Sequence, residues 1–119
     1  MSRVKVWNIT REASMGGRIE VANTTFRRAY GLLGRRRLEA EEGLWIRPSS
    51  GIHTFGMAFP IDVIGLDKEL KVIRLWSAIP PYRMTSLSWS MRSVLELPPG
   101  KILEAGTQIG DLLCIGGSV

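Results

Sequence analysis

The 119-residue sequence has little of what metal sites and many catalytic sites are built from. It holds one cysteine, Cys114, and one histidine, His53. A single cysteine excludes an internal disulfide and a zinc cluster built from cysteines, and no second histidine is present to complete a common metal set. The sequence therefore predicts no metal and no cofactor. Because Cys114 lies in an apolar run, we expect it to be a small buried hydrophobic residue.

Other absences narrow the class of protein. No apolar run approaches the roughly 20 residues of a transmembrane helix, and the N-terminus lacks the long apolar segment of a signal peptide. A Gly-x-Ser-x-Gly nucleophile elbow and a Gly-rich phosphate loop are both missing. Repeats and low-complexity segments are missing too. These absences predict a cytoplasmic protein without a membrane span.

What is present is typical of one globular domain over residues 1–119. With 45% hydrophobic and 23% charged residues, the chain can bury a core without disulfides or metals. The patterning predicts strands over residues 4–9, 18–23, 44–47, 61–66, 70–76, 93–97 and 112–115. It predicts short helices over 26–33 and 99–105. These elements indicate a mainly β fold, a β-sandwich or half-open antiparallel barrel with one or two short helices.

Two details of the strand pattern can be tested against a structure. Gly16 and Gly17 stand between the first two predicted strands and favour a turn there. Residues 67–69 join two apolar segments and predict a tight hairpin. Because residues 61–66 are apolar on both faces apart from Asp62, we expect this strand to be central.

The segment from His53 to Asp62 places polar residues in an apolar run. Side chains alternate along extended backbone, so His53, Phe55 and Met57 share one face. On the following strand, Asp62 shares a face with apolar residues. A carboxylate in such surroundings costs free energy unless it is paired. We therefore expect Asp62 to have a partner: His53, an arginine or backbone N–H groups.

The basic residues suggest an anionic partner. The formal net charge is +5, and the densest group includes Arg35 and Arg36. This group is either a solvated basic surface or a patch for an anionic small molecule or an acidic protein or peptide.

Aromatic residues bracket the Pro80-Pro81 pair. We expect Trp76, Tyr82 and Trp89 to pack under this loop, although they could instead form a stacking platform. They are not interleaved with basic residues, which disfavours a nucleic-acid face.

Several sequence blocks together resemble the DUF192 family. They occur in the family's order, cover residues 31–115, and include Gly31-Leu32-Leu33-Gly34-Arg35, Glu42-Gly43-Leu44-Trp45-Ile46, His53-Thr54-Phe55-Gly56-Met57, Pro60-Ile61-Asp62-Val63, Val94-Leu95-Glu96-Leu97-Pro98-Pro99-Gly100 and Gly106-Thr107-Gln108-Ile109-Gly110-Asp111. The resemblance implies a compact β-sandwich-like domain of unknown function. The chain departs from the family pattern at Gly56, where an aromatic residue is common, and this departure implies a differently shaped pocket.

Three hypotheses for function follow. The leading one is a non-catalytic binding domain with a shallow pocket lined by His53, Phe55, Met57 and Asp62, and a flank that includes Arg35 and Arg36. The second is a small hydrolase or acid–base enzyme that uses His53 and Asp62, and it requires a solvent-reached cleft. In the third, these two residues are purely structural.

Overall fold

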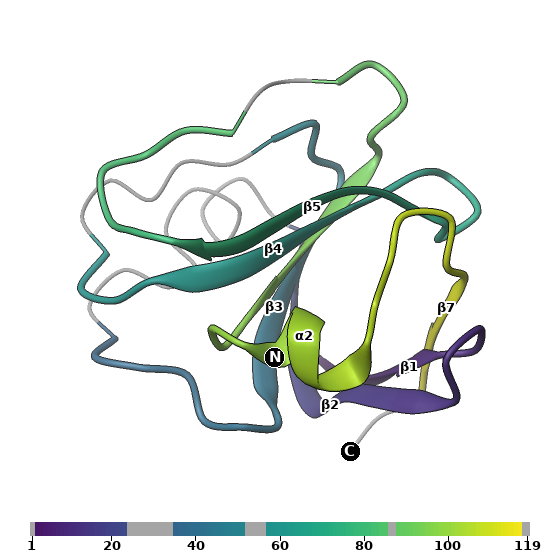
Figure 1. Ribbon diagram of the computed structural model, residues 1–119, viewed down its shortest axis with the longest axis horizontal. Coiled ribbons are helices and arrows are strands. Elements are labelled where there is room, and N and C mark those ends of the chain that lie inside the picture. Colours follow the sequence, from purple (N-terminus) through teal and green to yellow (C-terminus); the bar gives the residue numbers. More distant parts are fainter. Residues whose placement is uncertain (1, 24–34, 52–56, 86–87, 118–119) are drawn as a thin grey trace.

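Seven strands form one strongly curled sheet in the computed structural model, which describes residues 2–23, 35–51, 57–85 and 88–117 (Figure 1). Their order across the sheet is β5-β4-β6-β3-β2-β1-β7. The strands are β1 (Arg3–Asn8), β2 (Ala13–Ala22), β3 (Glu42–Ile46), β4 (Ile61–Leu66), β5 (Val72–Ile79), β6 (Ser93–Leu97) and β7 (Leu113–Gly116), and the helix is α2 (Lys101–Ala105). The predicted mainly β, half-open barrel is confirmed.

The strand pairing is antiparallel except between β2 and β3. A parallel pair requires a long crossover, and residues 23–41 provide one.

The 67–69 hairpin between β4 and β5 is confirmed, and β4 is central and fully buried. The turn predicted at Gly16 and Gly17 is wrong, because both glycines lie within β2 and the turn precedes this strand. The helix predicted over residues 26–33 falls outside the described residues.

The two ends of the sheet meet along part of their length. Val72 donates its N–H to the Asp111 carbonyl over 2.8 Å, and Leu113 donates to the Leu70 carbonyl over 2.9 Å. Nearby, the Asp111 carboxylate accepts hydrogen bonds from the buried Asn8 amide over 3.0 Å and from Arg11 Nε over 2.9 Å. These contacts tie the start of β5 and the end of β1 to the segment before β7, and thereby close one end of the barrel.

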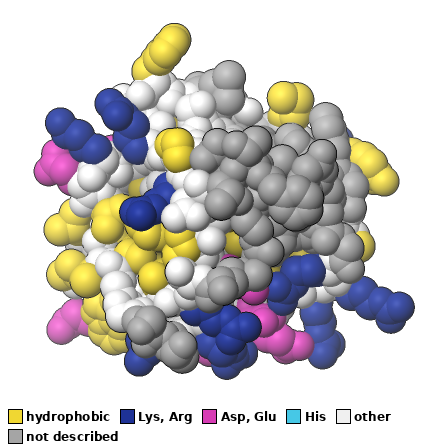
Figure 2. Space-filling view, turned by 180° about the vertical axis from the view of Figure 1, so that it is seen from behind, with side chains coloured by type: hydrophobic (Ala, Val, Ile, Leu, Met, Phe, Trp, Pro, Cys, Tyr) yellow, Lys and Arg dark blue, Asp and Glu magenta, His cyan; other side chains and the backbone are white. Residues whose placement is uncertain are grey.

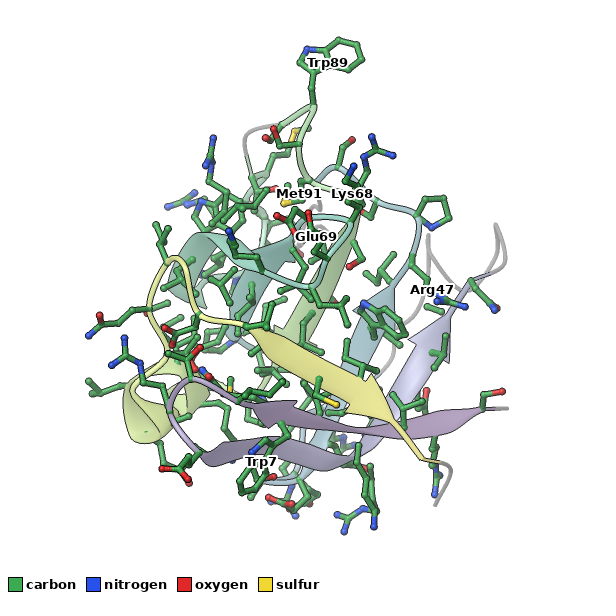
Figure 3. The ribbon with its side chains drawn as sticks, turned by 90° about the vertical axis from the view of Figure 1, so that its right-hand side faces the viewer. Trp7, Arg47, Lys68, Glu69, Trp89 and Met91 are labelled. Carbon is green, nitrogen blue, oxygen red and sulfur yellow. The ribbon has the colours of Figure 1, made fainter. Side chains whose placement is uncertain are left out.

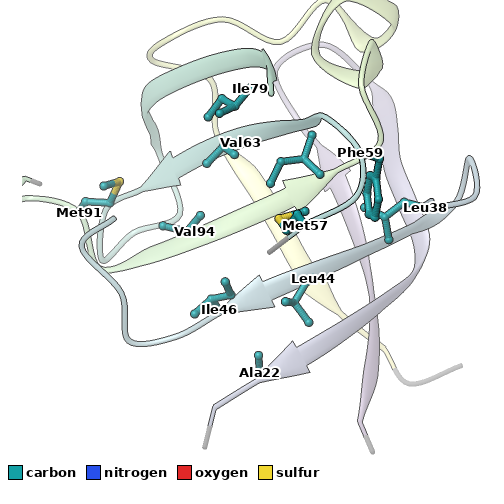
Figure 4. Close-up of a cluster of buried hydrophobic side chains, with 11 residues drawn as sticks. Ala22, Leu38, Leu44, Ile46, Met57, Phe59, Val63, Ile79, Met91 and Val94 are labelled. Atoms are coloured by element: carbon teal, nitrogen blue, oxygen red, sulfur yellow. The ribbon is translucent and has the colours of Figure 1, made fainter. Parts of the chain in front are cut away.

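Two apolar cores lie on opposite faces of the sheet. The inner core fills the barrel and includes residues of all seven strands together with Ile102 of α2. We call the other cluster the outer core; it lies on the opposite face of β3, β4 and β6 (Figure 4). Leu38, Met57, Phe59 and Met91, which lie outside the strands, pack against this face. The sheet is therefore buried on both sides around β4.

Cys114 corrects the sequence-based expectation. It is exposed rather than buried, on the outer face of β7, where it pairs with Trp7 of β1. Its neighbour Leu113 points into the inner core instead. Along a strand, alternate residues face opposite sides, so an apolar run on an edge strand does not place every member inside.

Gly43 is required by close packing between β3 and β6. A Cβ at this position would lie 2.6 Å from the Glu96 carbonyl oxygen and 2.8 Å from Ile19 Cδ1. We expect Gly43→Ala to lower the free energy of unfolding by about 2 kcal/mol, measured by urea denaturation. Gly116→Ala is the matched control on β7, where a Cβ meets no atom within 4 Å. Equal losses in both variants would contradict this packing argument.

Candidate functional site

Asp62, the second residue of β4, is completely buried, and backbone N–H groups are its partners. One carboxylate oxygen, Oδ1, accepts from Ala78 over 2.8 Å. The other, Oδ2, accepts from Gly100 over 3.1 Å and from Ile102 over 2.9 Å. Asp62 thus holds both the end of β5 and the first turn of α2, which has no side-chain cap of its own. Of the partners expected from the sequence, the structure provides the backbone groups.

The contact with Ala78 fixes a bulge in β5. Ile61 pairs with Ile79 and Val63 pairs with Trp76, so two residues, Ser77 and Ala78, lie opposite Asp62 alone. Ala78 has a φ of 48°, a left-handed conformation that costs an alanine free energy. The hydrogen bond from its N–H to the Asp62 carboxylate offsets this cost. The shape of β5 at this point therefore depends on Asp62.

A shallow open groove of about 460 Å³ lies directly over this bulge. Its walls are the second half of β5 and the segment that follows. The lining residues are Leu75, Trp76, Ser77, Ala78, Ile79, Pro80, Arg83, Met84 and Thr85. Most of these side chains are apolar, which suits a ligand with an apolar part. Asp62 does not line the groove, but it holds the backbone of one wall from behind.

The structure separates two of the residues predicted to share a pocket. Met57 lies in the outer core, whereas Asp62 points toward α2, on the face of β4 that carries Ile64 and Leu66. Met57 and Asp62 are therefore on opposite faces of the sheet. His53 and Phe55 fall outside the described residues. The predicted face-sharing of Asp62 with Ile64 and Leu66 agrees with the structure.

Glu96 is a second buried carboxyl group, which the sequence-based reasoning did not single out. It is 4% exposed and lies in β6, where it pairs with Leu44 of β3 on one side and with Val63 of β4 on the other. In the described part of the chain its side chain has no hydrogen bond or ion pair. Burial raises the pKa of Glu96 to about 8. Applied to this strand, the alternation argument used for Asp62 would have found it, because Glu96 shares a face with buried Val94.

The basic group around Arg35 and Arg36 is partly neutralised. Arg35 forms an ion pair with Glu42 over 2.9 Å and approaches Glu20 at 4.0 Å, and Arg37 pairs with Glu39 over 2.9 Å. The Glu39 N–H, and after it the charge of Arg35, hold the pKa of Glu42 below its ordinary value, although burial opposes them. Arg36 is exposed. From behind, basic side chains lie around a cluster of hydrophobic ones (Figure 2).

Two of the three aromatic residues near Pro80 and Pro81 are not core residues, contrary to expectation. Trp76 is partly buried against the outer core, but Tyr82 is 68% exposed and Trp89 is 100% exposed. Trp89 projects away from the body of the molecule, on the side opposite Trp7 (Figure 3). The segment after β5 therefore exposes apolar side chains, as surfaces that contact partners commonly do.

Comparisons with known proteins identify one family. The model of the family DUF192, described as "Uncharacterized ACR", matches residues 7–115. A UPF0127 protein of Thermococcus sibiricus (strain DSM 12597 / MM 739) is 32% identical over an alignment of 112 residues, with coverage of 90% of this chain and 66% of that relative. The chain thus spans about two thirds of the length of the curated relative it matches.

Two solved structures share the fold. A protein of unknown function from Novosphingobium aromaticivorans DSM 12444 has a TM-score of 0.80 at 24% identity, covering 94% of this chain and 83% of its own. A protein from Sinorhizobium meliloti 1021, described as a candidate transcription regulator, has a TM-score of 0.77 at 20% identity, with coverages of 96% and 92%. At these identities the similarity shows the fold alone. In the described part of the chain, no helix is long and apolar enough to cross a bilayer.

Proposed function

Since the chain belongs to the DUF192 family, which is described only as uncharacterised, we propose a function from its own geometry: a non-catalytic binding module. Its ligand site is the groove beside β5, and Asp62 is a positioning residue that sets the shape of one wall. The observation that carries this proposal is the hydrogen bond from the Ala78 N–H to the buried Asp62 carboxylate, directly beneath an open apolar groove.

The proposal modifies the pocket expected from the sequence. The expected pocket was lined by His53, Phe55, Met57 and Asp62. Asp62 contributes from behind the groove, and Met57 contributes to the outer core. A role for His53 and Phe55 in ligand binding stays a prediction. The anionic partner expected from the basic surface also belongs to the proposal, because Arg83 is among the residues that line the groove.

The burial of Asp62 favours binding over acid–base catalysis. A catalytic carboxylate must reach the substrate or orient a base in a solvent-reached cleft. Asp62 is 0% exposed, and both of its oxygens already accept backbone hydrogen bonds. The residues described contain no group of three His, Cys, Asp or Glu side chains that could hold a metal ion. These observations support a site that binds rather than reacts.

Titration with indole tests the proposed groove without knowledge of the natural ligand. In ¹⁵N-labelled protein, we expect indole to shift the amide signals of residues 75–85 most strongly, because its flat apolar ring fits an open apolar groove. The variant Ser77→Trp places a large side chain at the groove and should abolish these shifts. Shifts centred elsewhere, or unchanged shifts in Ser77→Trp, would refute the groove as the binding site.

A further inference from the structure

The residues that line the groove belong to the longest stretch of the sequence without acidic residues. This stretch includes β5, a strand at the edge of the sheet. Residues 70–95 contain no aspartate and no glutamate. They contain four basic residues: Lys71, Arg74, Arg83 and Arg92. The stretch includes all of the described residues that line the groove. Of the four basic residues, Arg83 lines the groove and Arg74 lies one residue before its lining begins.

The groove combines this charge with apolar surface. Arg83 is in the lining, and Arg74 is exposed on β5 one residue before the lining begins. No ion pair joins Arg74 to a carboxylate among the described residues. Met84, also in the lining, is 69% exposed, so an apolar side chain faces solvent beside these cations. The chemistry of the groove fits a ligand that carries negative charges next to an apolar anchor.

We propose that the partner is an acidic peptide segment that places one apolar side chain in the groove. This inference rests on the proposed function and adds the chemical class of the ligand. Carboxylates that flank the anchor lie near Arg83 and Arg74, since arginine forks bind carboxylates well. Apolar anchors in pockets supply most of the energy of such contacts, and complementary charge supplies specificity and speeds association.

A second copy of the chain and a lipid surface fit the groove less well. Pairing β5 with its counterpart in another copy would bring two acid-free stretches together, and their like charges would repel. A bilayer presents a broad interface and does not fill a concave groove with a single side chain, although it would accept exposed aromatic residues such as Trp89. The shape and charge of the groove together favour the acidic peptide.

Selection from a phage-displayed library of random peptides, each about a dozen residues long, tests this inference on the full chain. We expect a consensus with several acidic residues around one aromatic or leucine residue. Arg83→Glu should weaken the selected peptide about tenfold or more. Lys5→Glu changes the net charge equally at an exposed position of β1, a strand that contributes no residue to the lining, and should change affinity less than about twofold. Ser77→Trp should abolish binding, and circular dichroism checks that each variant is folded.

Three outcomes would overturn the inference. The first is a selection that gives no consensus, or one without acidic residues. The second is an equal loss of affinity in Arg83→Glu and Lys5→Glu, which indicates unspecific attraction. The third is binding to vesicles of phosphatidylserine and phosphatidylcholine that Ser77→Trp leaves unchanged. If indole still binds in the groove while the selection fails, the groove remains supported as a binding site, and only the acidic peptide is rejected as its ligand.

Discussion

Replacing Asp62 with alanine is expected to lower the free energy of unfolding by about 4 kcal/mol, among the largest losses for any single substitution in this chain. The reason is that three backbone N–H groups, those of Ala78, Gly100 and Ile102, lose their acceptor at once. Each unpaired N–H in buried or partly buried surroundings costs roughly 1–3 kcal/mol. Urea denaturation monitored by circular dichroism measures the loss.

Asp67→Ala provides the matched control. Asp67 also accepts two backbone N–H bonds, from Glu69 and Lys71, but it lies in the exposed hairpin between β4 and β5. Water can replace its carboxylate there, so we expect a loss below about 1 kcal/mol. Similar unfolding midpoints for both alanine variants would show that Asp62 does not support the fold in the way its contacts indicate.

The second large effect concerns Glu96 and depends on pH. Its folded-state pKa of about 8 lies above the ordinary value of 4.5 because burial disfavours the charged form. Between these two values the folded protein binds more protons than the unfolded chain, so stability falls as pH rises. Below about pH 4.5, Glu96 is protonated in both the folded and the unfolded protein and its burial costs no stability. Above about pH 8, the full free-energy cost of burying this group is present. At about 1.4 kcal/mol per unit of pKa, the full cost is on the order of 5 kcal/mol.

Glu96→Gln removes this titration while it keeps the size of the side chain. We therefore expect the variant to match the wild type at pH 4 and to exceed its free energy of unfolding by several kcal/mol at pH 9. Glu69→Gln, in the exposed hairpin, should follow the wild-type pH dependence. A constant difference between Glu96→Gln and wild type across this range would mean that Glu96 is ionised in the folded protein at neutral pH.

The sequence predicted the elements better than their arrangement. Alternating and apolar runs placed the described strands to within about three residues at each end, because burial on one or both faces leaves a periodic pattern. The exception is β2, which begins at Ala13, five residues before the predicted start. The parallel pairing of β2 with β3 was not predictable, since pairing across residues 23–41 depends on tertiary packing. The turn predicted at Gly16 and Gly17 was wrong because glycine within a strand can also allow close packing. A Cβ at Gly16 would lie 2.6 Å from Ile19 Cδ1.

The candidate site was predictable only in part. A carboxylate on a central apolar strand signals a partner, and the backbone was among those considered for Asp62. The identity of the three N–H donors was not readable, because Gly100 and Ile102 lie about 40 residues away in sequence. The groove depends on the bulge at Ser77 and Ala78, and neither residue type signals one. The exposure of Tyr82 and Trp89 was missed because aromatic residues beside a loop usually pack beneath it.

Indole binding to the near-isosteric variant Asp62→Asn tests most directly whether Asp62 shapes a binding groove. We expect Asp62→Asn to remain folded, to keep one acceptor oxygen, and to bind indole about fivefold or more weakly, because the wall at Ala78 loses its charged acceptor. Gly43→Ala, destabilised at the β3–β6 contact away from the groove, should bind indole like the wild type. Wild-type affinity in Asp62→Asn, or an equal loss in Gly43→Ala, would contradict a positioning role for Asp62.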